Sequence, residues 1–133
     1  MNTNARVQTS LFLLRLGVFI VMLMWTLDKL VNPDHAAAVF ERFYFIGGLG
    51  STIFLIIGLA ELALILAFLL GVKKTFTYGA VLVLHGVSTL SSYQQYMGFE
   101  SLLFFAAWPM LAACFALFYL RDLDTKYTLR QFA

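Results

Sequence analysis

The sequence predicts an all-α integral membrane protein: a bundle of four transmembrane helices, with a short interfacial helix in the first outer loop and both termini cytoplasmic. Composition is the first observation behind this prediction. Of 133 residues, 62% are hydrophobic and 12% are charged, whereas soluble domains are nearer half apolar and a quarter charged. A chain this short cannot bury so much apolar surface in one globule. The other two observations are apolar stretches of membrane-spanning length and a one-sided distribution of Lys and Arg.

Four stretches are long and apolar enough to cross the hydrocarbon layer, which takes about 20 residues. They cover residues 11–31, 52–70, 76–93 and 102–120, and we treat residues 1–133 as a single membrane domain. We expect the first stretch to be retained as a helix. The residues "DKLVNPDH" separate it from the small residues Ala36–Ala38, whereas cleavage of a signal peptide follows its apolar run closely.

The positions of Lys and Arg set the predicted orientation, because loops on the cytoplasmic side carry most of them. Two of the nine, Lys29 and Arg42, fall on one side of the four stretches. The other seven fall on the opposite side: Arg6, Arg15, Lys73, Lys74, Arg121, Lys126 and Arg130. Both termini are therefore expected to face the cytoplasm.

The loop after the first stretch is predicted to form a helix over about residues 33–46. Asn32 can cap this helix, and Pro33 can occupy its first turn. Glu41 and Arg42 are expected to point away from an apolar face. That face comprises Val39, Phe40, Phe43 and Tyr44. We expect the helix to lie on the outer membrane surface with its aromatic rings at headgroup depth. The alternative is a lid over a site below.

Glu61 lies near the middle of the second stretch, within the apolar run "GLAELALILAFLLG". An isolated carboxylate at this depth costs several kcal/mol, so it must be protonated, paired with a cation or hydrated in a cavity. Each case requires Glu61 to face the interior of the bundle. One interpretation is a hydrogen-bond anchor between helices. The favoured one is a proton-handling or ligand-binding acid, because ionisable groups inside membranes are usually functional.

His85 lies near the middle of the third stretch and begins a polar stripe that continues to the outer end of the helix. On a helical wheel, four residues lie within about 60° of it: Ser88, Thr89, Ser92 and Tyr96. Two interpretations stay open. One is a histidine satisfied by interhelical hydrogen bonding, and the other, slightly favoured, is an accessible polar path.

Further polar residues flank the first stretch. Arg15, at its cytoplasmic end, is expected to reach the phosphate headgroups, while Asp28 and Lys29 lie at its outer end. In the fourth stretch, Trp108-Pro109 predicts a kink, because proline removes a helix hydrogen bond. We therefore predict a polar pocket that opens toward the outer face. Glu61, His85, Asp28 and Lys29 form this pocket, and Arg15 and the stripe residues support it.

Several classes of function are excluded by what the sequence lacks. A single cysteine, Cys114, leaves no internal disulfide, CxxC pair or multi-cysteine metal site. Haem held by two histidines would need a second one at the depth of His85, whereas His35 lies in the outer loop, so we expect neither metal nor haem. The chain has no Gly-rich phosphate loop, GxSxG or HExxH motif. A formal net charge of +2 is too small to indicate a nucleic-acid partner.

Four short segments resemble the DoxX-like family of small four-helix bacterial membrane proteins. They are "LLRLG" (13–17), "WTLDKLVNP" (25–33), "GLAEL" (58–62) and Gly71, and they span about the first two-thirds of the chain. The family pattern has a small residue in its W-x-G-x-x-K region, where this chain has Leu27 and Asp28. The resemblance implies a multi-pass bundle in the bacterial inner (plasma) membrane. It also implies a link to quinone-dependent redox systems, with the family's polar positions at Arg15, Lys29 and Glu61.

Three functions follow as hypotheses. The first is a membrane subunit or accessory of a quinone-linked redox system, in which Glu61 and His85 bind the quinone head and a soluble or membrane redox partner supplies electrons. The second is a proton-coupled small-molecule transporter. The third is a non-catalytic membrane scaffold that binds a partner or forms a homo-oligomer. Whether the protein is an enzyme stays open.

Overall fold

The computed structural model of the protein describes residues 2–45, 47–48 and 50–132. In these residues the regular structure is helical, with no strand, so the predicted all-α class is confirmed. The α-helices are α1 (Thr3–Val31), α2 (Pro33–Tyr44), α3 (Ser51–Leu69), α4 (Lys74–Ser91) and α5 (Ala107–Tyr119). The 3-10 helices are η1 (Tyr93–Tyr96), η2 (Leu102–Ala106), η3 (Arg121–Leu123) and η4 (Arg130–Phe132).

The ends of α1 and α2 follow from local capping chemistry. α1 begins well before the first apolar stretch, because the Asn2 side chain caps it by accepting a hydrogen bond from the Ala5 amide at 2.8 Å. Asn32 separates α1 from α2, but its side chain makes no capping bond; its amide donates to the Asp28 carbonyl instead. α2 ends at Tyr44, where Phe45 adopts a left-handed conformation with φ of 59°. Residue 46, the predicted end, lies outside the described residues.

The turn between α3 and α4 is tight and is covered by the C-terminal segment (residues 120–132). Gly71 has φ of 71°, which favours glycine, and a Cβ there would lie 2.7 Å from Thr128 Cγ2. The Leu129 amide donates to the Leu70 carbonyl at 2.8 Å, and the Lys73 amide donates to the Phe132 carbonyl at 2.7 Å. The segment is thus bonded to the backbone of this turn on both sides.

The fourth apolar stretch forms η2 and α5 in succession. The change from 3-10 to α geometry falls between Ala106 and Ala107, just before Trp108-Pro109. Pro109 is the third residue of α5, so its missing N–H belongs to a first turn whose amides have few intrahelical partners in any case. The expected irregularity is therefore a change of helix type before the proline and not a break within the helix.

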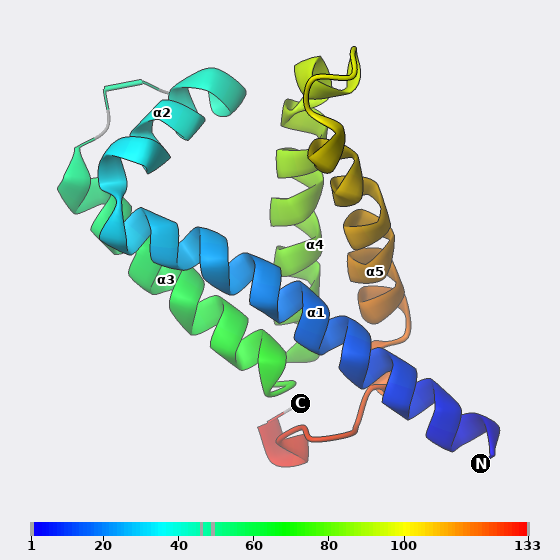
Figure 1. Ribbon diagram of the computed structural model, residues 1–133. Helices are drawn as coiled ribbons and strands as arrows, with labels where there is room; N and C mark the ends of the chain where they lie inside the picture. Colours follow the sequence, from blue (N-terminus) through cyan, green and yellow to red (C-terminus); the bar gives the residue numbers. More distant parts are fainter. Residues whose placement is uncertain (1, 46, 49, 133) are drawn as a thin grey trace.

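The four long helices form two pairs, α1 with α3 and α4 with α5 (Figure 1). The pairs meet at the end of the molecule where α1 begins and the C-terminal segment lies, which we call the terminal end. They diverge toward the opposite end, which we call the loop end, and which carries α2, η1 and η2 (Figure 1). α2 contacts α1, α3 and α4 there.

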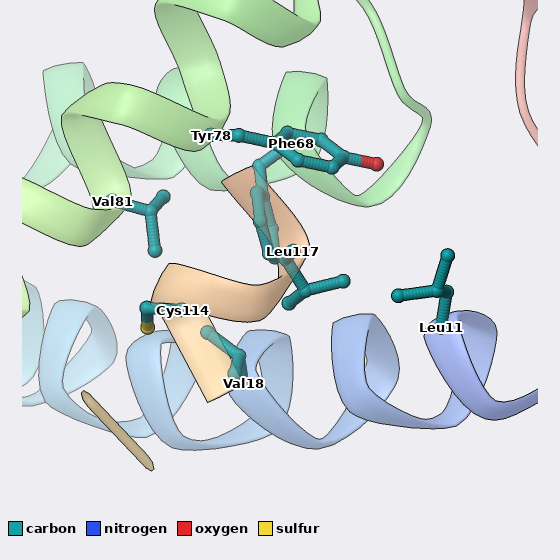
Figure 2. Close-up of a cluster of buried hydrophobic side chains, with 7 residues drawn as sticks. All are labelled: Leu11, Val18, Phe68, Tyr78, Val81, Cys114 and Leu117. Carbon is teal, nitrogen blue, oxygen red and sulfur yellow. The ribbon is translucent and has the colours of Figure 1, made fainter. Parts of the chain in front are cut away.

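The apolar core lies toward the terminal end, where all four long helices converge (Figure 2). Its buried members are Leu11 and Val18 of α1, Phe68 of α3, Tyr78 and Val81 of α4, and Cys114 and Leu117 of α5. The rings of Phe68 and Tyr78 are 4.9 Å apart and join α3 to α4. Each helix therefore contributes at least one side chain to a single contact region.

The outer surface of the bundle is that of a membrane protein. Among the described residues, three helical segments are long and apolar enough to cross a membrane: α1, residues 52–69 of α3, and the combined η2–α5 segment Leu102–Tyr119. Apolar side chains on the surface stay exposed, among them Met24, Ile56 and Phe115, at 61%, 63% and 55%. Such surface fits a lipid solvent better than water.

Candidate functional site

An ion pair between α1 and α3 is the strongest candidate site. Lys29 Nζ lies 3.1 Å from Glu61 Oε2, and the two side chains are 13% and 18% exposed. Lys29 is near the loop end of α1, and its side chain extends back along the helix, since Cβ atoms tilt toward a helix N-terminus. Of the three states expected for an intramembrane acid, the structure has the one paired with a cation.

Thr26 lies beside this pair, one turn before Lys29. Its buried hydroxyl is 3.3 Å from Glu61 Oε2 and 2.7 Å from the Met22 carbonyl oxygen. A hydroxyl has one hydrogen to donate, and the shorter contact takes it. The contact with Glu61 is therefore secondary, and Lys29 is the main partner of the carboxylate.

A glycine brings the two helices close together at this site. A Cβ on Gly58 would lie 2.6 Å from Leu30 Cδ2 and 2.8 Å from Leu30 Cγ, so the Leu30 side chain would have to move to make room for it. Gly58 is one turn before Glu61 on α3, so the close approach lies next to the ion pair. This gives a packing reason for the glycine of "GLAEL".

Lys29 has donor capacity to spare. An ammonium group carries three hydrogens, and within the part of the chain that the structure describes Glu61 is its one hydrogen-bond partner. Two hydrogens can therefore be donated to a bound molecule. Because both partners are partly exposed, a ligand head can reach them from the surface of the α1–α3 pair.

Asp28 belongs to a different pair. Its Oδ2 lies 2.7 Å from His35 Nδ1 at the start of α2, with the side chains 24% and 49% exposed. A carboxylate only accepts, so His35 Nδ1 carries the hydrogen. The Trp25 ring stacks on His35 with 6.3 Å between centroids. Asp28 thus ties α1 to α2 and makes no bond to Glu61.

His85 bonds across to α5. Its Nε2 lies 3.0 Å from the Ala107 carbonyl oxygen; since a carbonyl only accepts, Nε2 donates. This bond matches the interpretation of a histidine satisfied between helices. Within the described residues no hydrogen bond or ion pair joins His85 to Glu61. Figure 1 explains why, because Glu61 belongs to the α1–α3 pair and His85 to the diverging α4–α5 pair.

The hydroxyls of the polar stripe are largely taken up by nearby backbone, as is common for Ser and Thr in helices. Thr89 donates to the His85 carbonyl at 2.8 Å, Ser92 to the Ser88 carbonyl at 2.9 Å, and Tyr96 to the Thr89 carbonyl at 2.9 Å. Ser88 accepts a bond of 3.1 Å from the Tyr44 hydroxyl of α2. An accessible path along this stripe stays a prediction.

Arg15 is the residue whose surroundings differ most from expectation. The prediction that it reaches phosphate headgroups is wrong, because it is fully buried and bound to Asp124. Its Nη1 lies 2.5 Å from Asp124 Oδ1, and its Nη2 donates to the Lys126 carbonyl at 2.6 Å. Asp124, equally buried, also accepts a bond of 2.7 Å from the Tyr78 hydroxyl. Lys74 Nζ donates to the Asp124 carbonyl at 2.5 Å.

This terminal-end cluster of Arg15, Lys74, Tyr78 and Asp124 was missed, apart from Arg15, by reasoning from sequence. A signal for it existed. An arginine within an apolar stretch needs a counter-ion, and on its side of the predicted membrane the chain has two acids, Asp122 and Asp124. The choice between them depends on the path of the C-terminal segment, which the sequence does not reveal.

Two hollows lie at the loop end. One is lined by residues 99–104, and the other lies between α2 and the η1–η2 segment. Neither is lined by Glu61 or His85, so the four predicted pocket residues fall into separate groups: Lys29 with Glu61, Asp28 with His35, and His85 with α5. Among the described residues, no group of three or more His, Cys, Asp or Glu is placed to hold a metal ion.

Comparison with protein-family models, with curated proteins and with solved structures gives no match to this chain. The geometry of the residues themselves therefore carries any functional conclusion.

Proposed function

We propose that this chain is a DoxX-like protein of the bacterial inner membrane with four spans and both termini cytoplasmic, in which α4 is the remaining span. α4 has 18 residues and turns its polar side chains inward: Thr77 and Thr89 are buried, while Val83 and Leu90 are 62% and 65% exposed. Its average composition is too polar for a span, but its outward face is apolar. Lipid contacts only that face.

The contacts of three motif residues support the family proposal. Gly58 permits close packing of α1 on α3, and Gly71 has a positive φ under Thr128. Arg15 anchors the C-terminal segment through Asp124. Each of these residues makes a specific contact that gives a physical reason for its type at its position.

The function that the site supports best is a membrane subunit or accessory of a quinone-linked redox system. The observation that carries it is the Lys29–Glu61 pair, a partly exposed acid and base held side by side between two apolar helices. A bound quinone would supply the redox chemistry, and a partner redox protein would supply the electrons.

The residues present fit the head of a quinone. Lys29 has two ammonium hydrogens available for a carbonyl oxygen. Lys29 as a donor and Glu61 as an acceptor can therefore hydrogen-bond to a ligand head together.

Quinone binding by the detergent-purified protein tests this proposal. The fluorescence of Trp25, one turn before Lys29 on α1, should be quenched by a short-chain benzoquinone analogue, with Trp108→Phe used to isolate the signal. Glu61→Gln should weaken binding about tenfold or more, as loss of a charged hydrogen-bonding partner does, with little change in thermal stability. Glu100→Gln, which alters an exposed acid at the loop end, is the matched control and should bind as the wild type does.

Equal binding by wild type and Glu61→Gln would contradict the proposal. If instead the protein in liposomes shows proton-dependent uptake of a small molecule that Glu61→Gln removes, the pair serves transport. If Glu61→Gln changes neither quinone binding nor proton-dependent uptake but releases a co-purifying protein, the chain is a scaffold.

A further inference from the structure

The hollow between α2 and the η1–η2 segment has the chemistry of an anion site. Its volume is about 370 Å³, in the lower part of the range for small-molecule pockets. Eight residues line it: His35, Ala38, Val39, Arg42, Phe43, Gln95, Ser101 and Phe104. Two are basic, two are neutral hydrogen-bond donors, and none is a carboxylate. We refer to it as the α2 groove.

Arg42 is the principal charge in this groove. Within the described part of the chain, the ion pairs are Arg15–Asp124, Lys29–Glu61 and His35–Asp28, so Arg42 has no carboxylate partner. Its guanidinium lies 5.6 Å from the centroid of the Phe43 ring. A guanidinium fork matches the geometry of phosphate oxygens. Arg42 is therefore a cation with its hydrogen-bonding capacity unspent.

His35 faces the same groove with one nitrogen committed. Nδ1 is bonded to Asp28, which fixes the ring and leaves Nε2 as the nitrogen for a ligand. Asp34, Glu41 and Glu100 are not among the residues that line the groove. Glu41 is the side chain that a Cβ on Gly47 would meet, at 3.7 Å, and Glu100 lines the neighbouring hollow. Among the residues that line the groove, Arg42 is therefore the charged one without a paired carboxylate in the described chain.

Apolar side chains adjoin the basic ones. The Phe43 and Phe104 rings are 5.9 Å apart and join α2 to η2 across the groove. On the linker beside it, Met97, Phe99 and Leu103 are 81%, 88% and 89% exposed. Exposed aromatic and aliphatic side chains beside a cation suit the boundary between headgroups and acyl chains. A ligand with both a phosphate and an acyl chain fits this combination better than a free anion does.

We propose that the α2 groove binds the headgroup phosphate of an anionic phospholipid, held by Arg42 with His35, Gln95 and Ser101 as further polar contacts. The acyl chains run past Phe99 and Leu103. A lipid with a choline headgroup is disfavoured, because the groove lacks a carboxylate to face its ammonium. A bound lipid connects α2 to η2 and so bridges the two diverging helix pairs at the loop end.

Lipid binding measured by native mass spectrometry of the full chain in detergent tests this inference. Phosphatidylglycerol should be retained in preference to phosphatidylcholine of the same chain length. Arg42→Gln should lower the apparent affinity for phosphatidylglycerol about fivefold, the effect of one basic residue at a lipid surface. Arg6→Gln removes an exposed arginine at the terminal end and should leave it unchanged. Since Arg42 is exposed and unpaired in the described chain, the Arg42→Gln variant should keep the melting temperature of the lipid-free protein.

Three outcomes would overturn the inference. Equal retention of the two lipids would show that charge plays no part, and equal losses in Arg42→Gln and Arg6→Gln would show general attraction to basic residues. Binding of glycerol phosphate as strong as that of phosphatidylglycerol would assign the groove to a free phosphate ligand.

Discussion

The two ends of this bundle differ in how their charged side chains are paired and buried. At the terminal end, Arg15 and Asp124 are fully buried, and Tyr78 and Lys74 supply further bonds to Asp124. At the loop end, Lys29 with Glu61 and His35 with Asp28 are partly exposed, and each carboxylate has one strong partner. In the buried cluster most hydrogen-bonding groups already have protein partners. In the exposed pairs, Lys29 still has ammonium hydrogens free for a ligand. We therefore expect substitutions at the terminal end to change mainly stability, and substitutions at the loop end to change mainly the proposed binding.

The largest effect that separates the two ends is expected from Asp124→Asn. Removing one partner of a buried ion pair leaves Arg15 as an uncompensated charge, which costs about 3–5 kcal/mol of stability. Asp122→Asn, two residues earlier and exposed, is the matched control and should change the stability by less than about 0.5 kcal/mol. Denaturant unfolding in detergent measures both.

A double variant, Arg15→Met with Asp124→Leu, sharpens this test. Replacing both charges with apolar side chains of similar size removes the uncompensated charge, so much of the stability lost in Asp124→Asn should return. If Asp122→Asn and Asp124→Asn lose equal stability, the buried pair is not what holds the terminal end together.

An intermediate effect is expected from Gly58→Ala on α3. The added Cβ would lie 2.6 Å from Leu30 Cδ2, so the Leu30 side chain must move or α1 and α3 must separate beside the Lys29–Glu61 pair. We expect a loss of roughly 1–2 kcal/mol, within the range for overpacking, together with weaker quinone binding. Gly17→Ala on α1 is the control, because a Cβ there meets nothing within 4 Å, and the better helix propensity of Ala should leave stability equal or slightly higher. Equal stabilities of the two variants would contradict close packing at Gly58.

The smallest effect concerns pH at the loop end. Burial raises the pKa of Tyr96 above its usual value, and its hydroxyl donates to the Thr89 carbonyl at 2.9 Å. Because the pKa of Tyr96 is higher in the folded state than its ordinary value near 10, the protonated hydroxyl contributes its full stability below pH 10. That contribution is lost as pH rises through the raised pKa. Tyrosinate absorbance should therefore show one transition above pH 10 that Tyr96→Phe removes. A Tyr96→Phe difference curve with its midpoint at or below 10 would contradict the burial.

Sequence reasoning reached the helical class, which follows from local composition. From the cost of an isolated charge it also gave three possible states for Glu61, one of which is the ion pair that the structure has. The four helical stretches correspond to α1, α3, α4 and the η2–α5 segment, with ends displaced by capping at Asn2 and by the positive φ at Gly71 and Lys73. The prediction of one shared polar pocket could not be tested in this way from the sequence. The sequence places Glu61 and His85 at similar depth, but it does not reveal that the α1–α3 pair and the α4–α5 pair diverge.

The role of Arg15 was missed for a related reason. Periodicity places it on a face of α1, but its partner is 109 residues away in a segment without apolar periodicity. Such a contact depends on the path of residues 120–132 across the α3–α4 turn. Long-range pairing of this kind is decided by tertiary structure, and only the need for a counter-ion can be read from the sequence.

The buried position of Arg15 also has a consequence for biosynthesis. A ribosome adds roughly 5–20 residues per second, so Asp124, which follows Arg15 by 109 residues, is synthesised about 5–20 s later. During this interval the first helix must wait in the translocon or at the bilayer edge with its guanidinium satisfied by water or lipid phosphate. The Arg15–Asp124 contact can therefore form only after Asp124 has been synthesised, and a nascent chain stalled before Asp124 would be a ready substrate for membrane quality control.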